Sequence, residues 1–178
     1  EKYRAVYPGI EIHVDEGPDG EVAQWLTDHR VDIGFVTLPD DRFDTFPLME
    51  DQLVALLPLA HPLAKKNAVT LEELCASPFA MTRAGSEDII GGLFRALRLQ
   101  PTIRWRSLQL VSTIAAVARG EAVSIVAESA LPSDKAPGYV KKPLRPAARR
   151  QVALAVPDAR RMSPAAREFI RMAQEVFP

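Results

Sequence analysis

Small polar residues follow two apolar runs in this 178-residue chain, and they are residue types suited to binding a small polar molecule. Thr37 comes directly after VDIGFV, and Thr82, Arg83 and Ser86 come after PFAM. A hydroxyl can donate and accept hydrogen bonds, and a guanidinium can bind a carboxylate through two donors. Because ligands of open α/β sheets bind beyond the carboxyl ends of strands, the pattern predicts a site for a small anionic molecule.

Two helix starts belong to the same hypothesis. Ser86 precedes a helical pattern, and the free backbone N–H groups at a helix start favour an anion. A second group of candidates, Ser107, Leu108 and Gln109, opens the next helix. The alternatives are that Ser86 only caps its helix, that Arg83 is only solvated, and that Thr37 only caps its own loop.

Other kinds of chemistry find little support in the sequence. The single cysteine, Cys75, and the three histidines, His13, His29 and His61, do not have the spacing of metal ligands. There is no nucleophile with a neighbouring base, no pair of catalytic carboxylates and no phosphate-binding glycine loop. We therefore expect no enzyme, metal or cofactor, with Cys75 a core residue and His61 a stabiliser of its turn.

The periodicity predicts an α/β protein. A helix over 2–7, a strand over 10–15, a helix around Trp25 and a strand over 31–36 form an expected strand–helix–strand unit with parallel strands. Further strands are expected at 46–58, 78–82, 102–105, 122–127, 139–144 and 151–157, and further helices at 70–74, after Ser86, at 107–119 and from Pro164.

Charge is distributed unevenly along the chain. Residues 59–154 carry 14 Lys and Arg against 7 Asp and Glu, a net charge of +7, whereas the rest carries 8 against 16, a net charge of −8. The division predicts two lobes, 1–58 with 155–178 and 59–154, joined by two crossing segments. No apolar run approaches the roughly 18 residues of a membrane span, so no membrane association is expected.

Six motifs, in this order, carry a family resemblance: YPGIEIHVDEG, LTDHRVDIGF, LVALLPLAHPLA, PFAMTRAGS, VARGEAVSIV and RMSPAAREFI. Together they resemble the effector-binding domain of LysR-type transcriptional regulators over nearly the whole chain. The resemblance implies a two-lobed periplasmic-binding-protein type (type II) fold, a small-molecule effector, a homodimer or tetramer, and a cytoplasmic location. The family's N-terminal helix-turn-helix and first strand have no counterpart here, so DNA binding is expected only through that other domain.

The resemblance also implies an interface between subunits. It places Tyr3, Tyr7 and Ile12 of one subunit against the outer face of the 107–119 helix, or its basic neighbours, of another, and the charge split agrees with such a pairing. The basic run of Lys141, Lys142, Arg145, Arg149 and Arg150 is expected to be solvated or to face a partner. A solute-binding protein of a transporter, which shares the fold, is the alternative function.

Overall fold

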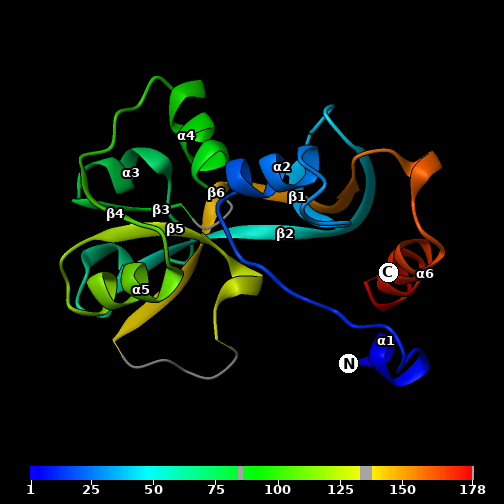
Figure 1. Ribbon diagram of the computed structural model, residues 1–178. Coiled ribbons are helices and arrows are strands. Elements are labelled where there is room, and N and C mark those ends of the chain that lie inside the picture. Colours follow the sequence, from blue (N-terminus) through cyan, green and yellow to red (C-terminus); the bar gives the residue numbers. More distant parts are fainter. Residues whose placement is uncertain (84–85, 133–137, 178) are drawn as a thin grey trace. The chain divides into compact units, whose positions relative to one another are not determined.

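The computed structural model describes residues 1–83, 86–132 and 138–177, and the chain divides into two compact units (Figure 1). Unit 1 comprises residues 1–50 and 151–178, and unit 2 comprises residues 51–150. Strands β2 (Asp44–Pro58) and β6 (Tyr139–Val156) both run from one unit into the other. The divisions fall within these strands rather than at 58/59 and 154/155, because an uninterrupted strand gives no sequence signal at its midpoint.

Unit 1 contains an antiparallel pair of strands together with the first part of β2. Strand β1 (Gly34–Leu38) pairs with the last part of β6, with Gly34 opposite Ala155 and Leu38 opposite Gln151. One small buried cluster centres on Leu26 and Val36, and another on Leu154 and Ile170. The helices of this unit are α1 (Lys2–Val6), α2 (Asp19–Thr27) and α6 (Pro164–Val176), with the 3-10 turn η3 (Ala159–Arg161).

The expected strand–helix–strand unit at the N-terminus is wrong. Residues 10–15 form no strand pairing with any described residue, and Val14 is 84% exposed. Strand β1 is antiparallel to β6, not part of a parallel pair. Alternation of apolar residues can indicate which face of a strand is buried, but a strand forms only where another backbone offers hydrogen bonds.

Unit 2 contains β3, β4 and β5 with parts of β2 and β6, and the order of these strands in the mixed sheet is β6-β2-β5-β3-β4. Strands β2 and β5 are antiparallel, whereas β3 runs parallel to both β5 and β4. Since parallel neighbours end at the same edge, β3 and β4 carry their following loops to one place. The bounds are β3 (Phe79–Thr82), β4 (Ile103–Ser107), β5 (Val123–Ala127), α3 (Leu71–Cys75), α4 (Glu87–Ala96), α5 (Leu110–Ala118), η1 (Pro62–Lys65) and η2 (Glu128–Ala130).

Both faces of the sheet are buried at β3, β5 and the second half of β2, which explains the continuous apolar runs in these strands. Leu53 and Leu57 belong to a large cluster that includes residues of α3 and α4. Val54 and Leu56, with the opposite side-chain direction, pack with Val117 of α5. Within the large cluster, the rings of Phe79 and Phe94 meet edge to face with centroids 5.3 Å apart.

The helix boundaries follow local sequence signals. Thr70 and Glu73 form a reciprocal capping box at the start of α3, where the sequence predicts a helix. Ser163 accepts a hydrogen bond from the amide of Ala166 at the start of α6. The two strands expected at 139–144 and 151–157 are instead one continuous strand, β6. Among the described residues there is no helix of the length and hydropathy needed to cross a membrane.

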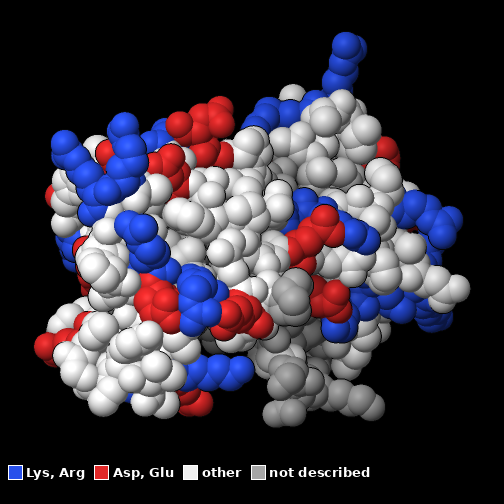
Figure 2. Space-filling view, turned by 90° about the vertical axis from the view of Figure 1, so that its right-hand side faces the viewer, with Lys and Arg blue, Asp and Glu red and all other residues white. Residues whose placement is uncertain are grey.

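The charge division largely follows the two units. Unit 1 has 8 Lys and Arg against 15 Asp and Glu, a net charge of −7, and unit 2 has 14 against 8, a net charge of +6. Many exposed charges are nevertheless paired locally, as Arg171 is with Glu168 and Glu175 in α6. On the face shown in Figure 2, basic and acidic side chains accordingly lie next to each other.

Candidate functional site

The carboxyl ends of β3 and β4 lie side by side in unit 2. Thr82 and Ser107, the last residues of the two strands, are register partners. The amide of Arg83 donates to the carbonyl of Ser107 over 2.8 Å, which extends the pairing one residue further. Helix α4 follows β3 and helix α5 follows β4, so this part of the unit combines two strand ends with two helix starts. Four of the predicted site residues are thus brought together: Thr82, Arg83, Ser86 and Ser107.

Ser86 occupies the N-cap position of α4, but its side chain does not cap the helix. The residue is buried, with 4% exposed, and its Oγ accepts a hydrogen bond from Nη1 of Arg150 over 3.1 Å. The alternative that Ser86 is only a cap is therefore wrong. The hydroxyl oxygen accepts from an arginine in a distant part of the chain, and sequence reasoning had no means to identify this partner.

Arg150 is held by the buried carboxylate of Asp51. Its Nη2 and Nε donate to Oδ2 of Asp51 over 2.9 and 3.1 Å, and the side chains are only 14% and 2% exposed. Ser129 completes the cluster, because its amide donates to Oδ1 over 3.1 Å and its hydroxyl to Oδ2 over 2.6 Å. The expectation that Arg150 is solvated or faces a partner is wrong, since a buried charge requires such partners.

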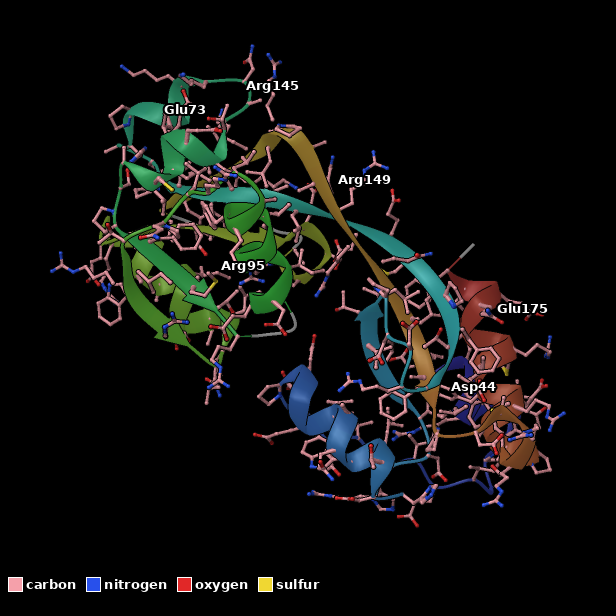
Figure 3. All side chains as sticks on the ribbon, turned by 90° about the horizontal axis from the view of Figure 1, so that it is seen from above. Asp44, Glu73, Arg95, Arg145, Arg149 and Glu175 are labelled. Atoms are coloured by element: carbon pink, nitrogen blue, oxygen red, sulfur yellow. The ribbon has the colours of Figure 1, made fainter. Side chains whose placement is uncertain are left out.

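The neighbouring residues of the basic run differ from Arg150. Arg145 and Arg149 are exposed on β6, and Figure 3 labels both side chains as they extend from the strand. Because successive side chains of a strand point to opposite faces, Arg149 and Arg150 face different surroundings although they are adjacent. The basic residues were grouped by sequence, but the pleat of β6 separates them.

Arg83 is about half exposed and is paired rather than only solvated. Its Nε lies 3.2 Å from Oε2 of Glu87, one turn into α4, and the other carboxylate oxygen of Glu87 contacts Arg106 of β4. Two arginines thus share one carboxylate, so these three side chains together carry a charge of +1. Asp88, in the same first turn of α4, offsets that charge.

The start of α5 differs in its local hydrogen bonding. The hydroxyl of Ser107 donates to the carbonyl of Gln109 over 2.7 Å and accepts from the Gln109 amide over 3.2 Å, so it stabilises its own turn. Leu108 and Gln109 are exposed. In its first turn α5 has neither a side-chain cap nor an acidic residue. The first amides of α5 therefore lack the two usual local compensations for a helix start.

Thr113 is a feature of this helix that sequence reasoning missed. It is 1% exposed, and among the described residues its Oγ1 has no hydrogen-bond partner. A buried hydroxyl without a partner is destabilising and requires an explanation. In the sequence Thr113 is hidden within the apolar pattern of α5, where a threonine reads as a β-branched core residue.

Thr37 lies in unit 1. It is partly buried near the end of β1, opposite Val152 of β6. In the loop that follows, Arg42 donates through two nitrogens to Asp40, and this pairing lowers the pKa of the Asp40 carboxyl. Thr37 thus stands at a strand end, as predicted, but in a different unit from the residues at β3 and β4.

The three residues expected at a subunit interface have different surroundings. Tyr3 is buried within unit 1, where its ring contacts those of Tyr7 and Phe169 and its hydroxyl donates to the carbonyl of Ala165 over 2.9 Å. Tyr7 and Ile12 are partly exposed. Tyr3 therefore supports the packing of α1 on α6, whereas Tyr7 and Ile12 retain accessible surface.

His61 and Cys75 have structural surroundings. Nδ1 of His61 accepts from the amide of Leu63 over 3.2 Å, which caps η1, and Nε2 lies 3.0 Å from the hydroxyl of Ser77. Burial lowers the pKa of His61 and raises the pKa of the Cys75 thiol. Among the described residues, no group of three or more His, Cys, Asp or Glu side chains could hold a metal ion.

Two α/β units joined by two strands, with polar residues at parallel strand ends, define a small-molecule-binding domain rather than a structural module. The whole chain, residues 1–178, matches the family model described as the LysR substrate binding domain. The chain belongs to this family, and its α/β fold is of the type II periplasmic-binding-protein kind. The family and the fold expected from the sequence motifs are both confirmed.

Individual relatives agree with this assignment. The HTH-type transcriptional regulator YvbU of Bacillus subtilis (strain 168) is 29% identical over 177 residues, which are 99% of this chain and 61% of the relative. The crystal structure of HinK, a LysR family transcriptional regulator from Pseudomonas aeruginosa, matches with a TM-score of 0.86 and 28% identity, over 98% of this chain and 63% of that one. This chain thus spans about three-fifths of each regulator.

A more distant structure shares the fold. The regulatory domain of CcmR from Synechocystis PCC6803, solved in complex with 2-PG, matches with a TM-score of 0.90 and 19% identity. The alignment covers 99% of this chain and 88% of that domain. The two proteins therefore share the fold over almost all of this chain.

Proposed function

We propose that this chain senses a small anionic effector for a LysR-type transcription factor, and that the effector binds at the carboxyl ends of β3 and β4. The observation that carries the proposal is the pairing of Thr82 with Ser107, which joins two parallel strand ends that each lead into a helix. In this proposal the effector contacts come from unit 2, and the residues are Thr82, Arg83, Ser86, Ser107, Leu108 and Gln109. Thr37, in unit 1, remains a separate candidate.

The electrostatics of unit 2 support an anionic effector. The start of α5 has no acidic residue and no side-chain cap to compensate its amides. Arg83 and Arg106 supply two guanidinium groups beside Glu87, and a guanidinium can bind an anionic group directly. The net charge of +6 on unit 2 attracts an anion over longer distances and raises its association rate.

We further propose that the domain works within an oligomeric transcription factor. The family relatives are transcriptional regulators, which favours a regulatory role over the alternative of solute transport and over an enzyme. We expect a homodimer or tetramer in the cytoplasm, with Tyr7 and Ile12 of one subunit meeting the 107–119 region of another. DNA is contacted through a helix-turn-helix domain, and effector binding biases the arrangement of the subunits on the DNA.

A ligand screen followed by calorimetry tests the site. The chain is first screened by thermal shift against phosphate, 2-PG, malate and benzoate, each beside a neutral analogue, and the best anion is then titrated. Replacing Thr82 and Ser86 by alanine should weaken that anion at least tenfold, which corresponds to about 1.4 kcal/mol.

The matched control is Thr102→Ala. Thr102 is exposed and precedes β4, at the opposite end of the strand from Ser107. Equal affinities of the wild type and the Thr82/Ser86 variant would place the site elsewhere. A neutral analogue that stabilises the chain as much as its anion would contradict the proposed charge preference.

A further inference from the structure

Asp51 and Arg150 occupy special positions in the chain. They are the first and the last residue of unit 2, and they lie on β2 and β6, the two strands through which the chain passes between the units. Their side chains are joined by two hydrogen bonds of 2.9 and 3.1 Å. The pair therefore links the two strands at the point where both enter unit 2.

The surroundings of the pair make this link strong and specific. Asp51 is almost fully buried, and both of its oxygens accept hydrogen bonds, from Arg150 and from Ser129 in η2. Removing one partner of such a pair leaves a buried charge without compensation, which is far more costly than losing an exposed ion pair. The exposed pairs elsewhere in the chain, such as Arg160 with Asp158, do not have this property.

Arg150 also connects the strands to the candidate effector site. Its Nη1 donates to Ser86, the residue that precedes α4, so one guanidinium holds both Asp51 and the start of the helix. Ser86 accepts in this bond, and its own O–H can donate to an acceptor group of a ligand. A ligand that bonds to Ser86 would thus be connected to the crossing strands through a single side chain, that of Arg150.

We propose that Asp51 and Arg150 form a latch that fixes the two crossing strands at the edge of unit 2 and couples their geometry to the occupancy of Ser86. A change in the orientation of the units must be absorbed by backbone angles in a few residues of β2 and β6. The latch keeps residues 51 and 150 at a fixed spacing. It thereby confines the change in backbone angles to the parts of the strands that lie in unit 1, residues 44–50 of β2 and 151–156 of β6. The coupling to a ligand rests on the proposed function, whereas the restraint on the strands does not.

Single-molecule energy transfer between the two units tests the latch without any ligand. In a Cys75→Ser background, dyes are attached to cysteines introduced as Arg167→Cys on α6 of unit 1 and Gln100→Cys before β4 of unit 2, both at exposed positions. In the otherwise unchanged protein we expect one narrow distribution of transfer efficiency. Arg150→Gln should at least double its width, and Asp51→Asn should do the same, because either change removes the buried side-chain link that supplements the pairing of β2 with β6 in the sheet.

Arg145→Gln is the matched control, because Arg145 is an exposed arginine on the same strand. It should leave the distribution unchanged, and the Asp51→Asn, Arg150→Gln double variant should be no broader than either single variant. Circular dichroism establishes that each variant is folded. If Arg150→Gln is unfolded, Arg150→Lys is measured instead. Lysine keeps the charge, but its single nitrogen cannot reproduce the bonds that three guanidinium nitrogens make to Asp51 and Ser86.

The latch would be overturned if a folded variant that lacks the Arg150 guanidinium kept the narrow distribution of transfer efficiency. That outcome is distinct from failure of the proposed function, which is decided by anion titration of the Thr82 and Ser86 variant. If both hold, the anion identified by the screen should shift the distribution of the wild type, and the Ser86→Ala variant should lose this shift. A shift of equal size in Ser86→Ala would overturn the coupling.

Discussion

The two units of this chain bury different kinds of residue. All of the polar or charged residues that are buried in the described part of the chain lie in unit 2: Asp51, Thr82, Ser86, Thr113 and Ser124. The described residues of unit 1 bury apolar side chains and Tyr3, and the site candidate of this unit, Thr37, is only partly buried. Among the described residues, buried polar side chains are thus confined to unit 2.

Unit 2 also has the more extensive apolar packing. The largest buried cluster of unit 2 has 14 members, whereas each of the two clusters of unit 1 has four. Unit 1 also leaves Val14 84% and Phe35 61% exposed. Since hydrophobic stabilisation grows with the apolar area buried, unit 2 has the stronger basis for independent stability. Each unit contains one of the two tryptophans, Trp25 in unit 1 and Trp105 in unit 2, so their unfolding can be followed separately.

The largest expected effect comes from truncating the core of unit 2. Phe79 is fully buried against Phe94, so Phe79→Ala removes both the ring contact and its burial and should cost about 3–5 kcal/mol. The measurement is urea unfolding followed by Trp105 emission in a Trp25→Phe background. Phe35→Ala in unit 1 is the matched control, followed by Trp25 emission in a Trp105→Phe background, and it should change stability by less than about 0.5 kcal/mol. Equal losses in the two units would remove the proposed difference in packing.

A smaller effect of opposite sign is expected at Thr113. Because its buried hydroxyl has no partner among the described residues, Thr113→Val should stabilise unit 2 by about 1 kcal/mol in the absence of ligand. Ser124→Ala is the comparison, because the Ser124 hydroxyl is equally buried but donates to the carbonyl of Ala80 over 2.7 Å, and its loss should be destabilising. Urea unfolding of unit 2 measures both variants. Destabilisation by Thr113→Val would mean that the hydroxyl is satisfied in solution.

The smallest expected effect is a pH dependence of unit 2 caused by His61. Burial lowers the pKa of His61 in the folded chain, so the unfolded chain takes up the proton first. The contribution of neutral His61 to stability is therefore complete above its ordinary pKa of 6.5 and is lost as pH falls through that value toward the folded pKa. Protonation would also remove the acceptor that caps η1.

Urea unfolding of unit 2 from about pH 7.5 to about pH 5.5 should reveal this loss. His61→Asn keeps a side-chain acceptor for the Leu63 amide but does not titrate in this range, so its stability should be flatter with pH. Parallel curves for the wild type and His61→Asn would assign the pH dependence to other groups.

Much of the local structure could be predicted because it depends on nearby residues. The capping box at Thr70, the serine cap at Ser163 and the continuous apolar strands of unit 2 are recorded in short stretches of sequence. The failure at residues 10–15 has an equally simple cause. Alternation there indicates a half-buried strand, but no described backbone pairs with it. Pairing partners are a property of the tertiary structure, and periodicity cannot supply them.

The candidate site likewise has features that depend on nearby residues and features that depend on distant ones. The sequence by itself determined that hydroxyl and arginine side chains follow two strands and precede two helices, because strand ends and helix starts have local signals. Only the tertiary structure decided that Ser86 is bound by Arg150 rather than capping α4, and that Arg150 is paired with Asp51, 99 positions away in the chain. Within β6, adjacent arginines face opposite sides, and the burial of one of them depends on what packs against that side. A buried charge is recognised by its partners, and those partners come from segments that only folding brings together.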